Sequence, residues 1–418
     1  MKLCAAMGPR ALLAFACCFA ASSQAGELLV DGVVSARGMR VEGQRSWLEG
    51  GFGRLGESGG GARDAEFAAR GQAHLGLDWR PSLEWLVHAH AAALAKPARA
   101  RGRDAGLVEA FVLYRPELDA RLSLRVKAGS YFPQTSRENV ERLWSSPYTI
   151  TLSALNSWIG EEVRLTGLEA GLVRKGDEDE FQLHAGGFGA NDSSGTVLAW
   201  RGWAMGDRLV TLGEALPLPS LRSFRPDGAF ASQRGDGTRP IDELDGRVGW
   251  NARARWERRD AVLLQAAFLD NRGDRDLHRG QYAWRTRFFQ AGLELRLAKG
   301  LRLIAEAADG TTGMGDRTLA HVDVDFRAGY ALVPWASGPL RLSARYDRFR
   351  NRDRDGTTEP NGEDGDAVTL AAFFSPRSFL RLGAEYLDLR AQRPAALHSG
   401  FDPDTNARRA TLELRLLF

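Results

Sequence analysis

The sequence predicts an all-β fold, a transmembrane antiparallel β-barrel of about eighteen strands, with sixteen strands as the alternative. Apolar and polar residues alternate in many segments, such as Arg121–Gly129 and Leu340–Phe349. Because successive side chains of a strand point to opposite faces, each segment has one apolar and one charged face. The segments run to about 9–16 residues, against ~5–6 in soluble sheets. Short and long connections also alternate, with tight turns at one end of the predicted barrel and long polar loops at the other.

Residues 1–25 have the pattern of a secretory signal peptide. Lys2 and Arg10 precede the apolar run Ala11–Ala21, and Ser23-Gln24-Ala25 fits the cleavage pattern of small residues. A membrane anchor is the alternative, but no stop-transfer pattern follows the run. We therefore expect one barrel domain over residues 26–418.

Cysteine and charge exclude several classes of function. Cys4, Cys17 and Cys18 all lie in the predicted leader, so the remaining chain has no disulfide and no thiolate site. Of the 56 Lys and Arg residues, two lie in the leader, which leaves 54 against 53 Asp and Glu. Nucleic-acid binding requires a concentrated basic patch, and this balance does not indicate one.

The strands follow one another from the N-terminus with one ambiguous stretch. Glu27–Glu57 does not divide cleanly, and either one bent strand or two fit it. Further along, Gly206-Asp207 reads as a tight turn between two long polar connections, residues 190–195 and 215–242. This turn contributes two of the eighteen strands. The final strand, Ala407–Phe418, returns to the end with the short turns.

The end of the chain resembles the C-terminal assembly signal of outer-membrane proteins. Phe418 follows Leu416, Leu414 and Leu412 at a spacing of two residues. The resemblance implies that Phe418 is read by the barrel-assembly machinery.

A second passage resembles phosphate-selective porins of the O/P type. Ala128–Pro133 leads into Ser136–Asn139 and Trp144–Tyr148, which are similar to the strand-to-loop passage of that family. Trp144 and Pro147 depart from the pattern, and no lysine-rich lumen is evident. By analogy, the loop Pro133–Gly160 is expected to fold into the lumen and narrow it. The candidate constriction residues are Arg137, Glu138, Arg142 and Trp144.

The charged face of the strands supplies candidate channel-lining residues. Arg121, Arg125, Lys127 and Arg164 flank the Pro133–Gly160 loop and are expected to form a cationic wall. The same alternation places Asp323 and Asp325 on the lumen face. The full set of predicted lining residues is Arg121, Arg125, Lys127, Arg164, Arg253, Arg255, Arg341, Arg345, Glu109 and Glu162.

Three further motifs favour ordinary structural roles. Gly51–Gly56 fits a dinucleotide fingerprint, but a glycine-rich loop follows instead of a helix. His88 and His90 share a strand face without an evident third metal ligand. The acidic loops Asn361–Asp366 and Asp402–Asn406 lack the regular ligand spacing of a calcium loop.

The sequence therefore predicts a porin of the outer membrane that lets small hydrophilic solutes diffuse, with mild anion preference. It implies no cofactor, no metal and no nucleic acid. The expected partners are outer-membrane lipid, lipopolysaccharide, the barrel-assembly machinery and small hydrophilic or anionic solutes, and a homotrimer is a candidate assembly. Two alternatives stay open: a barrel enzyme of the phospholipase kind, and a plugged barrel for adhesion or structure.

Overall fold

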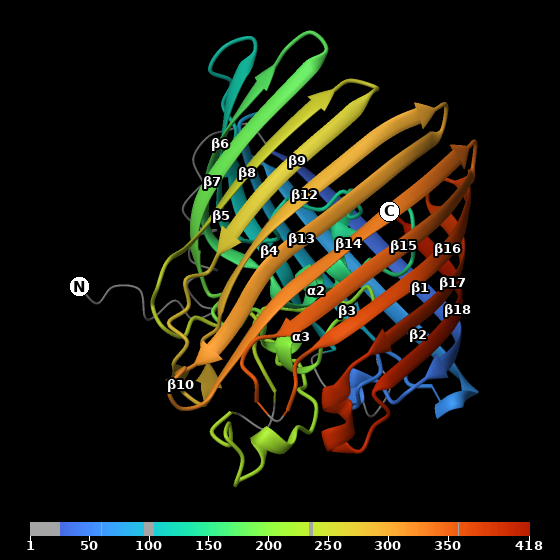
Figure 1. Ribbon diagram of the computed structural model, residues 1–418. Helices are drawn as coiled ribbons and strands as arrows, with labels where there is room; N and C mark the ends of the chain where they lie inside the picture. The colour runs from blue at the N-terminus through green and yellow to red at the C-terminus, as the bar shows by residue number, and fades with distance from the viewer. Residues whose placement is uncertain (1–25, 60, 96–103, 234–236, 358) are drawn as a thin grey trace.

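The chain forms a closed β-barrel. The computed structural model describes residues 26–59, 61–95, 104–233, 237–357 and 359–418, so the predicted signal peptide lies outside it. In this part of the chain, sixteen antiparallel strands close into one sheet, and the first strand pairs with the last. Figure 1 shows short turns at one end of the barrel and long loops at the other. The predicted fold class is confirmed, with sixteen strands instead of eighteen.

The strands of the barrel are β1 (Glu27–Gly43), β2 (Gly61–Arg80), β3 (Trp85–Leu94), β4 (Ala105–Tyr114), β5 (Leu122–Tyr131), β6 (Leu165–Lys175), β7 (Asp179–Gly189), β8 (Gly249–Arg258), β9 (Val262–Asp270), β12 (Arg285–Ala298), β13 (Leu301–Gly315), β14 (His321–Ser337), β15 (Leu340–Asp353), β16 (Glu363–Arg377), β17 (Leu380–Gln392) and β18 (Asp404–Leu417). A separate small hairpin pairs β10 (Leu277–His278) with β11 (Gln281–Tyr282). The helices are α2 (Ala154–Glu162) and α3 (Thr196–Trp200), with short 3-10 turns η1 (Trp47–Glu49), η2 (Arg142–Trp144), η3 (Arg222–Phe224) and η4 (Pro394–Ser399). None of these helices has the length and hydropathy needed to cross a bilayer.

The difference of two strands arises between β7 and β8. The predicted turn Gly206-Asp207 and the strands around it are wrong, because the described residues there form one long loop with α3 and η3. Thr196–Trp203 is a short, mainly apolar run in which Arg201 is the only charged residue, and its side chains are buried. Hydrophobic periodicity alone does not separate a short buried helix from a buried strand.

The ambiguous N-terminal stretch is a single long strand, β1, followed by a loop. β1 pairs with β2 on one side and with β18 on the other. Gly32 N donates to Phe418 O at 2.7 Å, and Phe418 N donates to Gly32 O at 3.0 Å. Closure pairs the backbone groups that an open edge would leave exposed to lipid.

The alternation of side chains reverses its polarity along a strand. In β15, the outward side chains Leu342, Ala344 and Tyr346 are apolar, and Arg348 and Arg350 follow them toward the long loops. The inward side chains of β15 change in the opposite sense, from charged residues near the short turns to an aromatic one. The apolar outer band is therefore confined to the part of the barrel nearer the short turns.

The same reversal corrects the prediction for β14. Asp323 and Asp325 point outward, whereas Val322, Val324 and Phe326 point inward and are buried. This end of β14 is the part beyond the apolar band, so water surrounds its outer face. Its inner face packs against loops inside the barrel. A period of two defines the faces of a strand but does not tell which face is inside.

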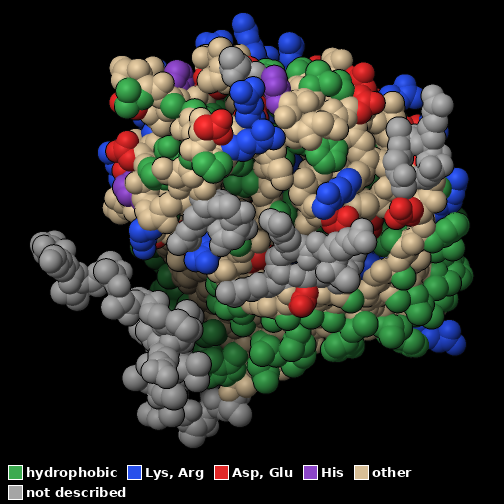
Figure 2. All heavy atoms as spheres, turned by 90° about the horizontal axis from the view of Figure 1, so that it is seen from below, with side chains coloured by type: hydrophobic (Ala, Val, Ile, Leu, Met, Phe, Trp, Pro, Cys, Tyr) green, Lys and Arg blue, Asp and Glu red, His purple; other side chains and the backbone are tan. Residues whose placement is uncertain are grey.

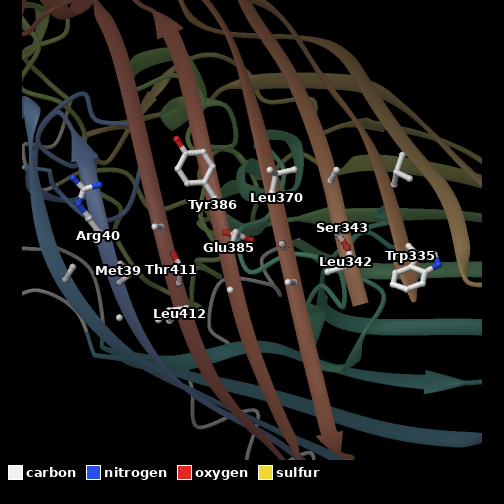
Figure 3. A pocket seen from close by; sticks show the side chains of 18 of the residues that line it. Met39, Arg40, Trp335, Leu342, Ser343, Leu370, Glu385, Tyr386, Thr411 and Leu412 are labelled. Atoms are coloured by element: carbon white, nitrogen blue, oxygen red, sulfur yellow. The ribbon is translucent and has the colours of Figure 1, made fainter. Parts of the chain in front are cut away.

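The outer wall has a hydrophobic groove of about 960 Å³ across β14–β18, β1 and β2. Figure 3 shows side chains from this wall, among them Trp335, Leu370 and Tyr386. The groove exists because small outward residues lie between larger ones. These small residues are Gly38, Ala344, Ala372, Ala384 and Ala410.

Candidate functional site

The loop between β5 and β6, residues 132–164, lies inside the barrel and is called the inner loop here. Figure 1 shows α2 within the ring of strands. Ile150 N donates to the carboxylate of Glu385 in β17 at 2.6 Å, and Ala154 N donates to Asp347 in β15 at 3.1 Å. The inner loop thus leaves the β5–β6 side and is held by the opposite wall. The predicted inward position of Pro133–Gly160 agrees with this geometry.

Glu138 fixes the shape of the inner loop. Its carboxylate accepts from Ser153 N at 2.9 Å and from Asn156 Nδ2 at 3.0 Å, and it pairs with Arg345 of β15. Ser153 Oγ accepts from Asn156 N and caps the start of α2. All these side chains are buried. The Glu138 carboxylate therefore links the start of α2 to Arg345 in the barrel wall.

A second segment crosses the lumen beside the inner loop. It comprises residues 203–212 of the long β7–β8 loop and is called the strap. Leu152 N donates to Gly206 O at 3.0 Å, and Val210 N donates to Gly160 O at 3.0 Å. Leu212 N then donates to Leu107 O of β4 at 2.7 Å. The inner loop and the strap thus form one layer across the barrel.

The ends of α3 are anchored by buried charged side chains. Glu162 accepts from Val197 N at 2.8 Å and from Leu198 N at 3.1 Å at the N-terminal end of α3. Burial raises the pKa of Glu162 to about 7, although these N–H groups act in the opposite direction. Arg393 donates to the carbonyl of Ala199 at 2.6 Å, and Arg54 donates to that of Arg201 at 2.7 Å.

One side of the lumen is filled by aromatic side chains. Trp158 of α2 is fully buried and meets Trp203 of the strap, Phe288 of β12 and Phe326 of β14 edge-on, with ring centroids 5.1–5.9 Å apart. Such an aromatic cluster excludes water from the part of the barrel near β12–β15.

The opposite side, formed by the inward faces of β18, β1 and β2, is charged and is called the polar wall. Arg37 and Arg70 lie side by side in the pairing of β1 with β2, and Arg37 lies opposite Glu413 in the pairing of β1 with β18. Successive contacts of 3.8 Å or less form an unbroken chain of alternating charge. Its members are Glu385, Arg409, Glu57, Arg70, Asp207, Arg37, Glu413 and Arg415.

Asp207 of the strap is the centre of this chain. Its carboxylate accepts from Arg37 Nη1 at 2.6 Å and from Gln72 Nε2 at 3.0 Å, and it also pairs with Arg70. Burial alone would raise the pKa of Asp207, but the guanidinium groups of Arg37 and Arg70 outweigh it and hold the pKa well below its usual value. Asp207 is thus an ionised carboxylate bound by two arginines and an amide.

Cavities follow the polar wall on both sides of Asp207. Two cavities of about 30 Å³ each have Asp207 in their lining. The one nearer the long loops is also lined by Glu57 and Arg409, and the other by His74 and Arg415. Each volume has room for roughly one or two water molecules. Asp207 is therefore the residue that separates the two cavities along the polar wall.

A third cavity, of about 670 Å³, opens at the end with the short turns. Asp31 and Arg142 form an ion pair in its lining. It shares Val33, Leu143 and Ser145 with the neighbouring cavity. Figure 2 looks onto the other end, where charged side chains of both signs are scattered among polar atoms and hydrophobic ones gather along one edge.

Most of the predicted lining residues do point inward, but they lie on strands other than those of the polar wall. Lys127 and Arg253 lie near Glu169, with Arg253 Nη2 at 3.2 Å from its carboxylate. Arg341 donates to Pro147 O of the inner loop at 2.8 Å. The inward set comprises Arg125, Lys127, Glu109, Arg253, Arg255, Arg341 and Arg345. None of these seven lines the three cavities described above.

Three predicted lining residues are placed elsewhere. Arg121 is exposed in a short turn and pairs with Asp177 at 3.0 Å. Arg164 is fully buried against the ring of Phe132 and donates to backbone carbonyls of β4 and the strap. Glu162 belongs to α2 and holds α3. The predicted cationic wall of four residues is therefore wrong. Neither Arg121 nor Arg164 lies in a strand, because Arg121 comes just before β5 and Arg164 just before β6.

The four predicted constriction residues divide into two pairs. Glu138 holds the inner loop, as described, and Arg137 packs over Gly292 of β12. Arg142 and Trp144 line cavities along the polar wall. The ring of Trp144 stacks on Phe132 at 4.2 Å between centroids.

Sequence reasoning missed the residues that matter most on the polar wall. Arg37 lies in the stretch that could not be divided into strands, and Asp207 lies in the predicted turn. Arg415 and Glu413 share the charged face of the last strand, opposite the leucines, and this was visible in the sequence. Closure of a barrel brings the first and last strands together, which is the signal that could have joined Arg37 to Glu413.

The other candidate ligand groups have protein partners. His90 Nε2 contacts His74 Nδ1 at 3.0 Å, and His88 Nδ1 contacts Asp78 at 2.6 Å. In the first acidic loop, Glu363 points inward to Arg54 at 2.9 Å. Among the described residues, the carboxylates of Asp192, Glu243 and Asp245 form a close group. Leu244 N and Asp245 N already donate to Asp192.

The fold has solved counterparts. The outer membrane channel DcaP of Acinetobacter baumannii superposes with a TM-score of 0.57 at 13% identity, over 95% of this chain and 99% of that one. OmpF of Salmonella typhi gives 0.53 at 11% identity, over 94% and 98%.

The trimer form of OmpT, an outer membrane protein of Vibrio cholerae, gives a TM-score of 0.50 at 10% identity, over 94% of this chain and 100% of that one. The fold is that of an outer-membrane porin barrel. The predicted placement in the outer membrane agrees with this fold and with the apolar outer band. No family model and no curated protein matches the sequence.

Proposed function

We propose that the protein is an outer-membrane channel that lets small hydrophilic solutes pass along the polar wall. The observation that carries the proposal is the chain of eight alternating charges with cavities on both sides of Asp207. Fixed charges that line a narrow path replace the hydration of a passing solute. The dry aromatic cluster on the other side of the lumen confines solutes to this path.

We further propose a mild preference for anions. Arg37, Arg70, Arg409 and Arg415 are barrel-wall residues, whereas Asp207 and Glu57 belong to loops. Displacement of the strap would leave the arginines in excess. The sequence resemblance to phosphate-selective porins of the O/P type also favours anions. The inward position of the inner loop is consistent with that resemblance.

The test is planar-bilayer conductance of the purified protein, with the folded state checked by heat-modifiable migration on gels. We expect ion-conducting steps and a reversal potential in a KCl gradient displaced toward anions. Absence of conductance from a heat-modifiable barrel would contradict the channel.

A plugged structural barrel is the second candidate, and the filled lumen favours it. At Asp207 the cavities hold no more than about two waters each. A plugged barrel would give the gel shift without conductance, so the same experiment separates the two. We propose no catalytic role.

The outer groove is proposed as the contact between copies in a homotrimer. Small residues on a membrane face allow close approach of another barrel wall, and a structural neighbour is described in a trimer form. Replacing Ala372 and Ala384 by Leu should shift a cross-linked trimer to monomer, whereas Leu at Ala254, in another outer groove, should not. Lipid and lipopolysaccharide are the proposed surroundings of the outer band, and the last strand the proposed contact with the assembly machinery.

A further inference from the structure

Asp207 occupies a site that is built from the barrel wall and does not depend on the strap. The Arg37 side chain is only 2% exposed, and the guanidinium group has bonds to both Asp207 and Glu413. Gln72 donates from the neighbouring strand. The three donors come from two paired strands, so they stay in place when the strap moves.

The site also has donor capacity that Asp207 does not use. Among the described residues, Arg37 Nη2, Arg70 Nε and Ser35 Oγ are buried without a hydrogen-bond partner. Ser35 is opposite Gln72 in the pairing of β1 with β2, and it lies two residues before Arg37 on the same inward face. Unpaired buried donors are costly and favour an acceptor with more than one oxygen.

The bound group is a carboxylate, and it lies between two cavities. Asp207 lies in the lining of both small cavities, one on each side. Arg70 lines one of these cavities and Gln72 the other, so the Asp207 side chain stands between the spaces that its two donors face. A planar carboxylate matches the fork of a guanidinium group better than a spherical halide does.

We propose that this site binds the carboxylate group of small organic anions, and that Asp207 is a built-in competitor that holds the strap closed. A solute carboxylate takes the place of Asp207 on Arg37, Arg70 and Gln72, and the strap is released. This inference rests on the proposed channel and names its solute class. A tetrahedral anion such as phosphate is the competing solute class.

Acetate binding tests the site without any need for conductance. We would titrate wild type and variants with sodium acetate at constant ionic strength and follow broadening of the acetate methyl signal by NMR. Asp207→Ala should broaden the signal severalfold more than wild type, and adding Arg37→Gln should remove the gain. Asp177→Ala, in an exposed turn, is the control and should match wild type.

Asp207→Asn separates a vacated site from a change of net charge. Asn removes the charge but keeps the bulk, so it should broaden acetate less than Asp207→Ala does. Equal broadening in the two variants would overturn the displacement of a self-ligand. Inorganic phosphate, followed by its own signal, should broaden less than acetate, and the reverse order would overturn the carboxylate class.

Conductance then tests the link to transport. Asp207→Ala should conduct with larger steps than wild type, and acetate should reduce them. Acetate binding without conductance in either protein would sink the proposed channel and keep the site. Conductance that is indifferent to Asp207 would sink this inference and keep the channel.

Discussion

At the scale of single residues, buried charge holds the lumen together. Arg345 is completely buried and pairs with both Glu138 and Asp347. Such a pair contributes little net stability compared with apolar packing, but removing one partner leaves an uncompensated buried charge. The inner loop is therefore held by contacts that tolerate no single loss.

Arg345→Met should release the inner loop. The change leaves two carboxylates without their cation, at a cost of about 3–5 kcal/mol. We expect trypsin to cut at Arg137 and larger conductance steps, both measured on the folded barrel. Arg354→Met removes a half-exposed pair with Asp325 and serves as the control. An inner loop equally resistant in both variants would contradict the role of Arg345.

Trp158→Ala should loosen α2 without unfolding the barrel. The lost packing of a buried tryptophan costs about 3–5 kcal/mol, and the damage is local because the strands keep their backbone pairing. Amide hydrogen exchange of α2 should rise severalfold. Trp250→Ala, at a half-exposed outward position on β8, should leave that exchange unchanged.

At the scale of elements, alternation in the sequence predicted most strands of the barrel wall, but it added two false strands around Gly206-Asp207 and did not predict the segments that fill the lumen. Alternation identified the inward faces of Arg125, Lys127 and Arg253, because lipid and lumen impose opposite polarity. It failed for Asp323, because at that end of β14 the outer face meets water and the inner face packs against loops. It also failed for the strap, because a loop segment packed inside a barrel shows neither the two-residue period of a strand nor the ~3.6-residue period of a helix.

Gly32→Val should weaken barrel closure. A Cβ at Gly32 would collide with the ring of Phe418, which packs on the outer face of β1. We expect a smaller heat-modifiable fraction after refolding. Gly38→Val is a matched control, since nothing lies near a Cβ there on the same strand. Recovery by Phe418→Ala in the Gly32→Val background would show that the collision is the cause.

At the scale of the whole molecule, one barrel contains two environments. The apolar cluster around Trp158 makes one part of the lumen a protein interior, and the polar wall lines another part with charged side chains. The layer formed by the inner loop and the strap couples them, since it contacts both.

Deleting residues 138–157 should therefore raise conductance, because the layer loses Glu138 and the first turn of α2. Deleting Arg317–Leu319, an exposed tip of the β13–β14 loop, should not change it. Unchanged steps in the first variant would show that ions avoid the space that the inner loop fills.

The reversal of polarity along strands such as β15 also indicates where the apolar outer band ends. The outward apolar stretch of β16, Val368–Phe374, has about seven residues, which at a rise of ~3.3 Å and a tilt of ~45° span about 16 Å. Arg348, Asp366 and Asp388 begin the charged ring above it on neighbouring strands. This height is less than the ~25 Å band usual for such barrels. On β1 the outward side chains from Leu28 to Gly38 are apolar, so the band is taller there, and we expect the bilayer to thin beside β16 and not around the whole barrel.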